Sequence, residues 1–164
     1  MSVHLYLTWP GNYQQEFKCL QLDLMNGKTR VDRVNAISGF ASRQHENFIH
    51  PANDESGSGR AIPEGVYRLG VPEYNPQSWG DGLGYWWTDI IAQPEFRLNS
   101  RGAFGLHDDF NRTYAMGSAG CVVTYTTADF QRVLKWLQMR ARPTTLVVDW
   151  KLGVLGLKGY PIVA

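Results

Sequence analysis

The segment TTADFQRVLKWLQMRARPTTLVVDW, residues 126–150, decides the fold class, because it places the clearest helix of the chain directly before a strand. Thr126 and Asp129 resemble a capping box in which Asp replaces the usual Glu or Gln. Apolar residues then recur at the spacing of one helix face: Phe130, Val133, Leu134 and Leu137. Pro143 is expected to stop the helix. Residues 144–150 are rich in β-branched side chains and predict a strand.

The remainder of the chain reads as strands separated by turns and two long loops. Alternating, β-branched or aromatic runs predict strands at 4–9, 17–24, 29–38, 66–71, 85–91 and 103–107. The polar, Gly-rich stretches 41–60 and 72–84 indicate loops. We therefore predict a single mostly β domain over residues 1–164, a curved mixed sheet or sandwich with one main α-helix. Residues 151–164 are expected to form a C-terminal extension.

Composition and charge are those of an ordinary globular protein and exclude several functions. Apolar residues make up 43%, charged residues 19%, and the net charge is +1, so the basic excess of a nucleic-acid binder is missing. No apolar run reaches the length of about 18 residues that a membrane span requires. Residues 1–10 lack the basic and small-residue features of a signal peptide. We therefore expect no nucleic acid partner, no membrane partner and no signal peptide.

The segment GLHDDFNRTYAMGSAGCVV, residues 105–123, carries the candidate chemistry. His107 closes a predicted strand, and Cys121 follows it along the chain, directly behind Gly120. A thiol becomes a good nucleophile when a nearby imidazole takes its proton. Gly120 permits close approach of a substrate and lets the N–H groups of residues 120 and 121 turn toward a developing oxyanion. His107 and Cys121 are therefore a candidate base and nucleophile.

Each member of this pair also has a structural interpretation, and a second cysteine allows a pair in which the cysteine precedes the histidine along the chain. Cysteine is commonly an inert buried residue, and a histidine at the end of a strand is commonly structural. Papain-like enzymes place the cysteine before the histidine, an order that Cys19 and His107 would satisfy. Cys19, however, lies in an alternating strand without a neighbouring Gly, so we expect it in the core.

Residues 118–122, SAGCV, resemble the SxGC[IV] signature of the YkuD-type L,D-transpeptidases, and His107 is similar to the histidine of their upstream HG. Three further stretches are similar to motifs of that family in the same order: ISG at 37–39, IPEGVY at 62–67 and PTTLVV at 143–148. Together the matches cover about residues 15–150. The chain departs from the family at Asp108, which replaces a Gly, and at Val123, which replaces an Arg.

The resemblance implies a β-rich catalytic domain that acts on peptidoglycan stem peptides. No cofactor is expected, and the absence of CxxC and HExxH motifs argues against a zinc site. The resemblance implies that Cys121 forms a thioester with a stem-peptide carbonyl and that His107 is the acid–base group. Water as acceptor gives an L,D-carboxypeptidase or endopeptidase, and a second stem amine gives an L,D-transpeptidase. The departures favour a divergent hydrolytic, toxin-effector or phage branch.

Localisation and partners follow from the same resemblance. We expect action in the bacterial periplasm or cell wall. Because no signal peptide is visible, we expect delivery by a secretion system or a phage. Peptidoglycan stem peptides are the expected partner, an immunity or delivery protein is a further candidate partner, and the protein is expected to be a monomer.

The side chains beside the pair each have more than one interpretation. Ser118 either bonds the loop or the substrate, or is a simple turn residue. Asp108 and Asp109 either orient His107, as carboxylates do in catalytic triads, or bind a substrate ammonium group. A third interpretation makes them two solvated loop acids, since Asp is rarely buried without a partner.

Aromatic and further histidine residues complete the candidate set. Tyr114 and Trp86, with Trp87 beside it, either line the substrate cleft or pack in the sheet. His45 and His50 lie in a predicted loop without the spacing or partners of a metal site, so no metal centre is expected.

Three functions fit these residues. The first is a peptidoglycan stem-peptide acyl-transfer enzyme with Cys121, His107, Gly120 and Ser118 as catalytic residues. The alternative is a non-catalytic cell-wall-binding or phage structural domain that retains the fold, which Val123 in place of an arginine favours. The third is a cysteine hydrolase of peptides outside the cell wall. Thiol reactivity separates the first two, and a substrate panel separates the first from the third.

Overall fold

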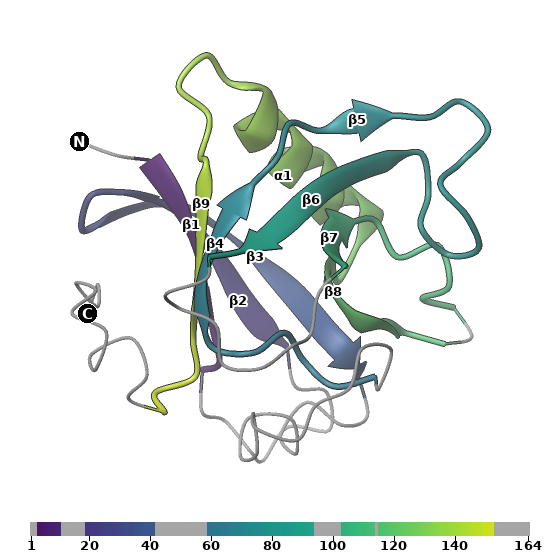
Figure 1. Ribbon diagram of the computed structural model, residues 1–164, viewed down its shortest axis with the longest axis horizontal. Coiled ribbons are helices and arrows are strands. Elements are labelled where there is room, and N and C mark those ends of the chain that lie inside the picture. Colours follow the sequence, from purple (N-terminus) through teal and green to yellow (C-terminus); the bar gives the residue numbers. More distant parts are fainter. Residues whose placement is uncertain (1–2, 11–18, 42–58, 94–102, 114, 153–164) are drawn as a thin grey trace.

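A computed structural model describes residues 3–10, 19–41, 59–93, 103–113 and 115–152 of the chain (Figure 1). This part forms nine strands and one helix, so the predicted mostly β class with one main helix is confirmed. The elements are β1 (Val3–Thr8), β2 (Leu20–Asn26), β3 (Thr29–Phe40), β4 (Gly65–Leu69), β5 (Glu73–Tyr74), β6 (Trp86–Ala92), β7 (Phe104–His107), β8 (Gly117–Thr124), α1 (Thr127–Gln138) and β9 (Thr145–Asp149). No helix of the described part is long and apolar enough to cross a membrane.

The strands form one mixed sheet that closes on itself. Its order is β4-β9-β1-β2-β3-β8-β7-β6-β5, and an additional pairing between β4 and β6 completes the ring (Figure 1). β5 pairs with β6 outside that ring. Neighbours are antiparallel except for β1 with β9 and β7 with β8, which are parallel. Closure leaves the ring strands with a partner on each side, which stabilises a sheet against edge-to-edge association.

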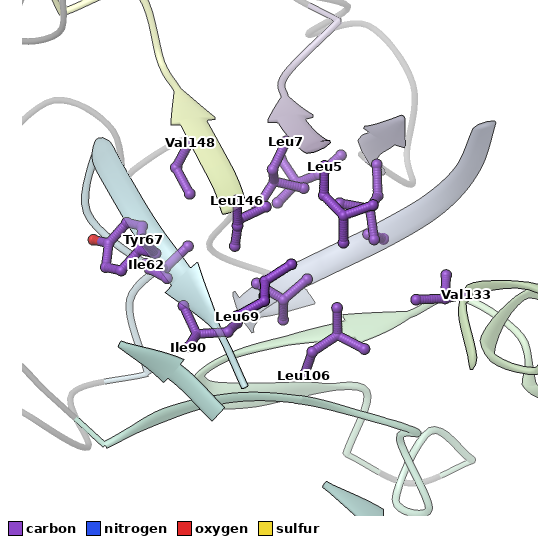
Figure 2. Packing of buried hydrophobic residues seen from close by; sticks show 14 of the residues in the cluster. Leu5, Leu7, Ile62, Tyr67, Leu69, Ile90, Leu106, Val133, Leu146 and Val148 are labelled. Atoms are coloured by element: carbon purple, nitrogen blue, oxygen red, sulfur yellow. The ribbon is translucent and has the colours of Figure 1, made fainter. Parts of the chain in front are cut away.

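Aliphatic side chains from alternate strand positions fill the space inside the ring (Figure 2). Leu5 pairs with Leu146 and Leu7 with Val148 between β1 and β9, and all four are fully buried. Leu106 of β7 belongs to the same cluster. Burying one such side chain contributes about 1.5–3 kcal/mol. Leu106 therefore anchors β7 from the core side, which directs its neighbour in sequence to the opposite face.

Helix α1 packs its apolar face onto this core. Thr126 is the N-cap, and its hydroxyl accepts a hydrogen bond from the Asp129 N–H at 3.0 Å, as the sequence predicts. The buried residues of the helix all belong to the cluster inside the ring: Phe130, Val133, Leu134, Trp136 and Leu137. The helix ends at Gln138, before Pro143, because Met139 already adopts an extended conformation with ψ 153°. Proline therefore follows the end of the helix and does not cause it.

The clearest omission of the sequence prediction concerns residues 117–124, to which no strand was assigned and which form β8. β8 lies between β3 and β7 and pairs with both. Its strand signal is hidden by Gly117 and Gly120, whose φ values are 112° and 139°. A methyl group at Gly117 would lie 2.3 Å from the carbonyl oxygen of Gly39, so the close approach of β8 to β3 at this point requires glycine.

Smaller differences affect other elements. β5 (Glu73–Tyr74) lies within the predicted loop 72–84, where a two-residue strand leaves no periodic signal. β2 begins at Leu20, so Cys19 precedes the strand in which it was expected. Residues 42–58 of the long predicted loop, and 153–164 of the extension, lie outside the described residues.

Candidate active site

The parallel pair β7–β8 sets the positions of the candidate base and nucleophile. Leu106 pairs with Val122, and His107 pairs with Val123. Side chains alternate between the two faces of a strand, and Leu106 and Val122 both point into the core cluster. His107 and Cys121 therefore share the opposite face, on neighbouring strands, although fourteen positions separate them in the sequence.

A cavity of about 190 Å³ opens on this face. Both His107 and Cys121 line it, and their roles as base and nucleophile stay predictions. The other lining residues come from the loop before β6, the loop after β7 and the start of β8: Asp81, Gly82, Leu83, Asp109, Asn111, Gly117, Ser118 and Ala119. Among the described lining residues two are acids and none is a lysine or an arginine, so this lining favours a substrate group with a positive charge.

The imidazole of His107 is only 3% exposed, and one of its nitrogens has a fixed role. Nδ1 lies 2.6 Å from the backbone carbonyl oxygen of Asp108. A carbonyl can only accept, so Nδ1 carries the proton and Nε2 of the neutral ring is an acceptor. Nε2 is buried and has no hydrogen-bond partner among the described residues. Burial lowers the pKa of His107, while the Asp108 carbonyl and the charges of Asp109 and Asp108 act in the opposite direction. The ring is therefore neutral at neutral pH and able to accept a proton.

The indole of Trp87 covers His107 from the neighbouring strand β6. Gly105 makes this possible, because a methyl group at that position would lie 2.2 Å from Cζ2 of Trp87. The indole N–H donates to Asp89 Oδ1 at 2.7 Å, which fixes the ring over β7. Of the two adjacent tryptophans considered from the sequence, Trp87 thus contacts the candidate base. Trp86 points to the other side of β6, where it lines a separate aromatic pocket and packs against the core.

Asp108 and Asp109 are both buried, with exposures of 4% and 2%, so they are not solvated loop acids. The Asp108 carboxylate accepts from the Asp109 N–H at 2.9 Å and from Arg112 Nη2 at 2.5 Å. It is the backbone carbonyl of Asp108 that contacts His107. The Asp109 carboxylate accepts from the N–H groups of Asn111 at 3.0 Å and Gly117 at 2.9 Å. These hydrogen bonds give the loop after β7 its shape, with Asp109 facing the cavity and Asp108 facing α1.

Ser118 and Gly120 are held in place by contacts with β3. Ser118 Oγ donates to the Cys121 carbonyl at 2.6 Å and accepts from the N–H groups of Gly39 at 3.1 Å and Gly120 at 3.2 Å. Ser38 Oγ donates to the Gly120 carbonyl at 2.9 Å. Both serines therefore fix the backbone on either side of the thiol, and the Gly120 N–H expected at an oxyanion already has an acceptor.

The remaining candidates lie elsewhere. Cys19 precedes β2 away from the cavity lining, and burial, followed by the charge of Asp129, raises the pKa of its thiol to about 11. Tyr114, His45 and His50 lie outside the described residues. Within the described part of the chain, no group of three or more His, Cys, Asp or Glu side chains is placed to hold a metal ion.

Comparisons with solved structures identify the fold. Bd1075 of Bdellovibrio bacteriovorus matches with a TM-score of 0.54 and 16% identity, over 90% of this chain and 47% of that one. The helical cell shape determining protein Pgp2 from Campylobacter jejuni matches with a TM-score of 0.53 and 14% identity, over 92% of this chain and 49% of that one. The chain shares its fold with a bacterial cell-shape determining protein. It spans about half the length of these structures. No protein-family model and no curated protein sequence matches the chain.

Proposed function

We propose that this chain is a cysteine acyl-transfer enzyme of the L,D-transpeptidase type, acting on peptidoglycan stem peptides. The observation that carries the proposal is the cavity lined by both Cys121 and His107. The proton of the His107 ring lies on Nδ1, and Nε2 has no hydrogen-bond partner among the described residues. A thiol beside a neutral, correctly protonated imidazole is the arrangement required for nucleophilic acyl transfer. The resemblance of SAGCV to the family signature and the fold shared with Pgp2 support a cell-wall substrate.

The proposed reaction proceeds by two acyl transfers. His107 Nε2 takes the proton of the Cys121 thiol as the sulfur attacks the peptide carbonyl carbon. The tetrahedral intermediate collapses, the C–N bond breaks, and the leaving amine takes the proton from Nε2. Water or the amine of a second stem then attacks the thioester, His107 accepts its proton, and the thiol is restored. Water gives hydrolysis, and the amine gives a cross-link.

The Gly120 N–H, a candidate donor to the oxyanion, is not free to receive it in this structure. The Gly120 N–H donates to Ser118 Oγ at 3.2 Å, which is a long hydrogen bond. A substrate oxyanion at Gly120 would have to replace that contact. Loss of one oxyanion donor typically costs about 3 kcal/mol of barrier, so the acylated enzyme is expected to differ from this structure at residues 118–120.

The direct test incubates the purified chain with disaccharide-tetrapeptide muropeptides and follows the products by liquid chromatography and mass spectrometry. We expect loss of a terminal residue or formation of a cross-linked product, and a thioester adduct on the peptide that contains Cys121. Cys121→Ala should abolish both, while Cys19→Ala is the matched control and should retain activity. Binding of muropeptides without conversion, equal in both variants, would instead establish the non-catalytic alternative.

A further inference from the structure

Arg112 joins the loop that follows the candidate base to the segment that follows the candidate nucleophile. No sequence motif predicted a role for it. Its guanidinium donates from Nη2 to Asp108 Oδ1 at 2.5 Å and from Nη1 to Thr127 Oγ1 at 2.8 Å. Nε donates to the Tyr125 carbonyl at 3.2 Å, and Nη2 is also 3.3 Å from the carbonyl of Thr124. One side chain thus bridges the β7–β8 loop and the connection between β8 and α1.

The environment of this ion pair makes it stronger than a surface contact. The Arg112 side chain is 20% exposed and that of Asp108 is 5% exposed. Charged hydrogen bonds gain strength where water is excluded. The planar guanidinium also fixes the direction of each bond, which the single ammonium group of a lysine does not do. Arg112 therefore restrains the Asp108 side chain in both distance and orientation.

Restraining Asp108 has a consequence for His107. The two are adjacent, and the Asp108 backbone carbonyl is the acceptor for the His107 Nδ1–H at 2.6 Å. The same residue is held at its side chain by Arg112 and by the Asp109 N–H. A residue fixed at its side chain cannot rotate its peptide freely, so the carbonyl remains directed at Nδ1.

Resting on the proposed function, we propose that Arg112 is a positioning residue for the acyl-transfer reaction. Through Asp108 it keeps the His107 proton on Nδ1, which leaves Nε2 to accept the thiol proton. It also holds the loop of the base and the exit of β8, the strand of the nucleophile, at a constant separation. Small displacements of a base or nucleophile reduce rates about 100-fold, so this restraint matters more for turnover than for substrate binding.

The test compares Arg112→Gln, Arg112→Lys and the control Arg132→Gln in the full chain. Arg132 of helix α1 forms an exposed ion pair with Asp32 of β3. Its replacement therefore measures the effect of removing an arginine away from the cavity. We expect Arg112→Gln to lower kcat about 10–100-fold with KM nearly unchanged. Arg112→Lys keeps the charge but not the planar fork, and should recover part of that loss. Arg132→Gln should retain wild-type kcat.

A second measurement reports on the base itself, without turnover. Nitrogen-15 NMR of the His107 ring distinguishes the Nδ1–H from the Nε2–H tautomer. We expect the Nδ1–H form in the wild type and in Arg132→Gln, and a mixture in Arg112→Gln. A purely structural role for Arg112 would lower the stability of the Arg112 variants without changing the tautomer.

Wild-type kcat and an unchanged tautomer in Arg112→Gln would overturn the proposal, as would equal losses in Arg112→Gln and Arg132→Gln. If Arg112→Gln does not fold, Arg112→Lys and Asp108→Asn replace it, since both keep a hydrogen-bonding group at the contact. Either of these with the wild-type tautomer and kcat would then overturn it. If the wild type converts no muropeptide, the proposed function fails, and the NMR measurement still decides whether Arg112 sets the tautomer.

Discussion

The indole of Trp87 lies nearly parallel to the imidazole of His107, with ring centroids 5.5 Å apart and planes inclined by 12°. The two residues stand on the neighbouring strands β6 and β7, where Thr88 pairs with Leu106. The indole shields one face of the imidazole from water. Burial is the main reason that the pKa of His107 is lowered, so the stacking helps to keep the imidazole neutral.

Replacing Trp87 by leucine should shift the pH dependence of the proposed reaction. Water would reach His107, and its pKa would rise toward the ordinary value of 6.5. The reaction needs the neutral imidazole, so the acid limb of kcat/KM should move to higher pH. Asp108 and Asp109, whose charges already raise this pKa, remain in place. A shift of one pH unit would reduce the rate up to about tenfold on the acid limb, measured from about pH 5 to 9 with muropeptide substrate.

Two further variants test whether the stacking causes that shift. Gly105→Ala places a methyl group where the Trp87 ring lies, so it should displace the ring and move the acid limb in the same direction. Trp79→Ala removes an exposed tryptophan from the loop before β6 and should leave the limb in place. An unchanged limb in both Trp87→Leu and Gly105→Ala would show that the indole does not control the protonation of His107.

The two cysteines should differ strongly in reactivity with iodoacetamide. Burial raises the pKa of Cys19 to about 11, so its thiol stays protonated at neutral pH. Cys121 and His107 line the same cavity, and in the proposed reaction the imidazole accepts the proton of this thiol. Mass spectrometry of the digested protein should therefore find the label on Cys121 first. His107→Gln should slow labelling of Cys121 but not of Cys19, and labelling of both cysteines at equal rates would contradict an activated thiol.

Two features of the structure were accessible from the sequence because each depends on residues that are close along the chain. The order of His107, Gly120 and Cys121 predicted a pair on one cavity, and both line it. The capping residue Thr126 was equally clear, since a cap depends on contacts within one helical turn. Both signals are local, and the chain alone contains them.

The missing parts depend on contacts between distant segments. Trp87 reaches His107 only because Gly105 on the adjacent strand has no side chain. Strand β8 exists because β3 and β7 pair with it, although its glycines interrupt the residue pattern that would indicate a strand. The role of the Asp108 carbonyl belongs to the backbone, which residue types do not report. Register and backbone direction decide these features, and a single sequence does not display them.

The stability of the protein should fall below neutral pH in part because of His107. Its pKa in the folded protein lies below that of the unfolded chain, since burial disfavours the charged ring. The unfolded state therefore binds the proton first, and the free energy of unfolding decreases as the pH falls through about 6.5 toward the folded-state pKa. His107→Gln removes this term. Urea unfolding between about pH 5 and 8 should show a smaller pH slope in the variant.

The other histidines are present in both the wild type and His107→Gln, so they contribute equally to the pH dependence of the free energy of unfolding in the two proteins. His4→Gln is the matched control, since it removes a buried histidine of β1 away from the cavity. An equal slope in the wild type and in His107→Gln would show that His107 has the same proton affinity in the folded and unfolded states.

Ser38 connects β3 to β8 and to the segment before β4, and it should contribute to stability more than its size suggests. Its Oγ donates to the Gly120 carbonyl at 2.9 Å and accepts from the Ile62 N–H at 2.8 Å, and the residue is fully buried. Ser38→Ala removes one partner from each of two backbone groups, and each buried group left unsatisfied costs about 1–3 kcal/mol. We expect a total loss of about 2–4 kcal/mol, measured by urea unfolding.

Ser78→Ala in a solvent-facing loop is the control, where a loss of about 0.5 kcal/mol is expected. Because Gly120 directly precedes Cys121, Ser38→Ala should also reduce Cys121 labelling, and equal stability of the two alanine variants would contradict this account.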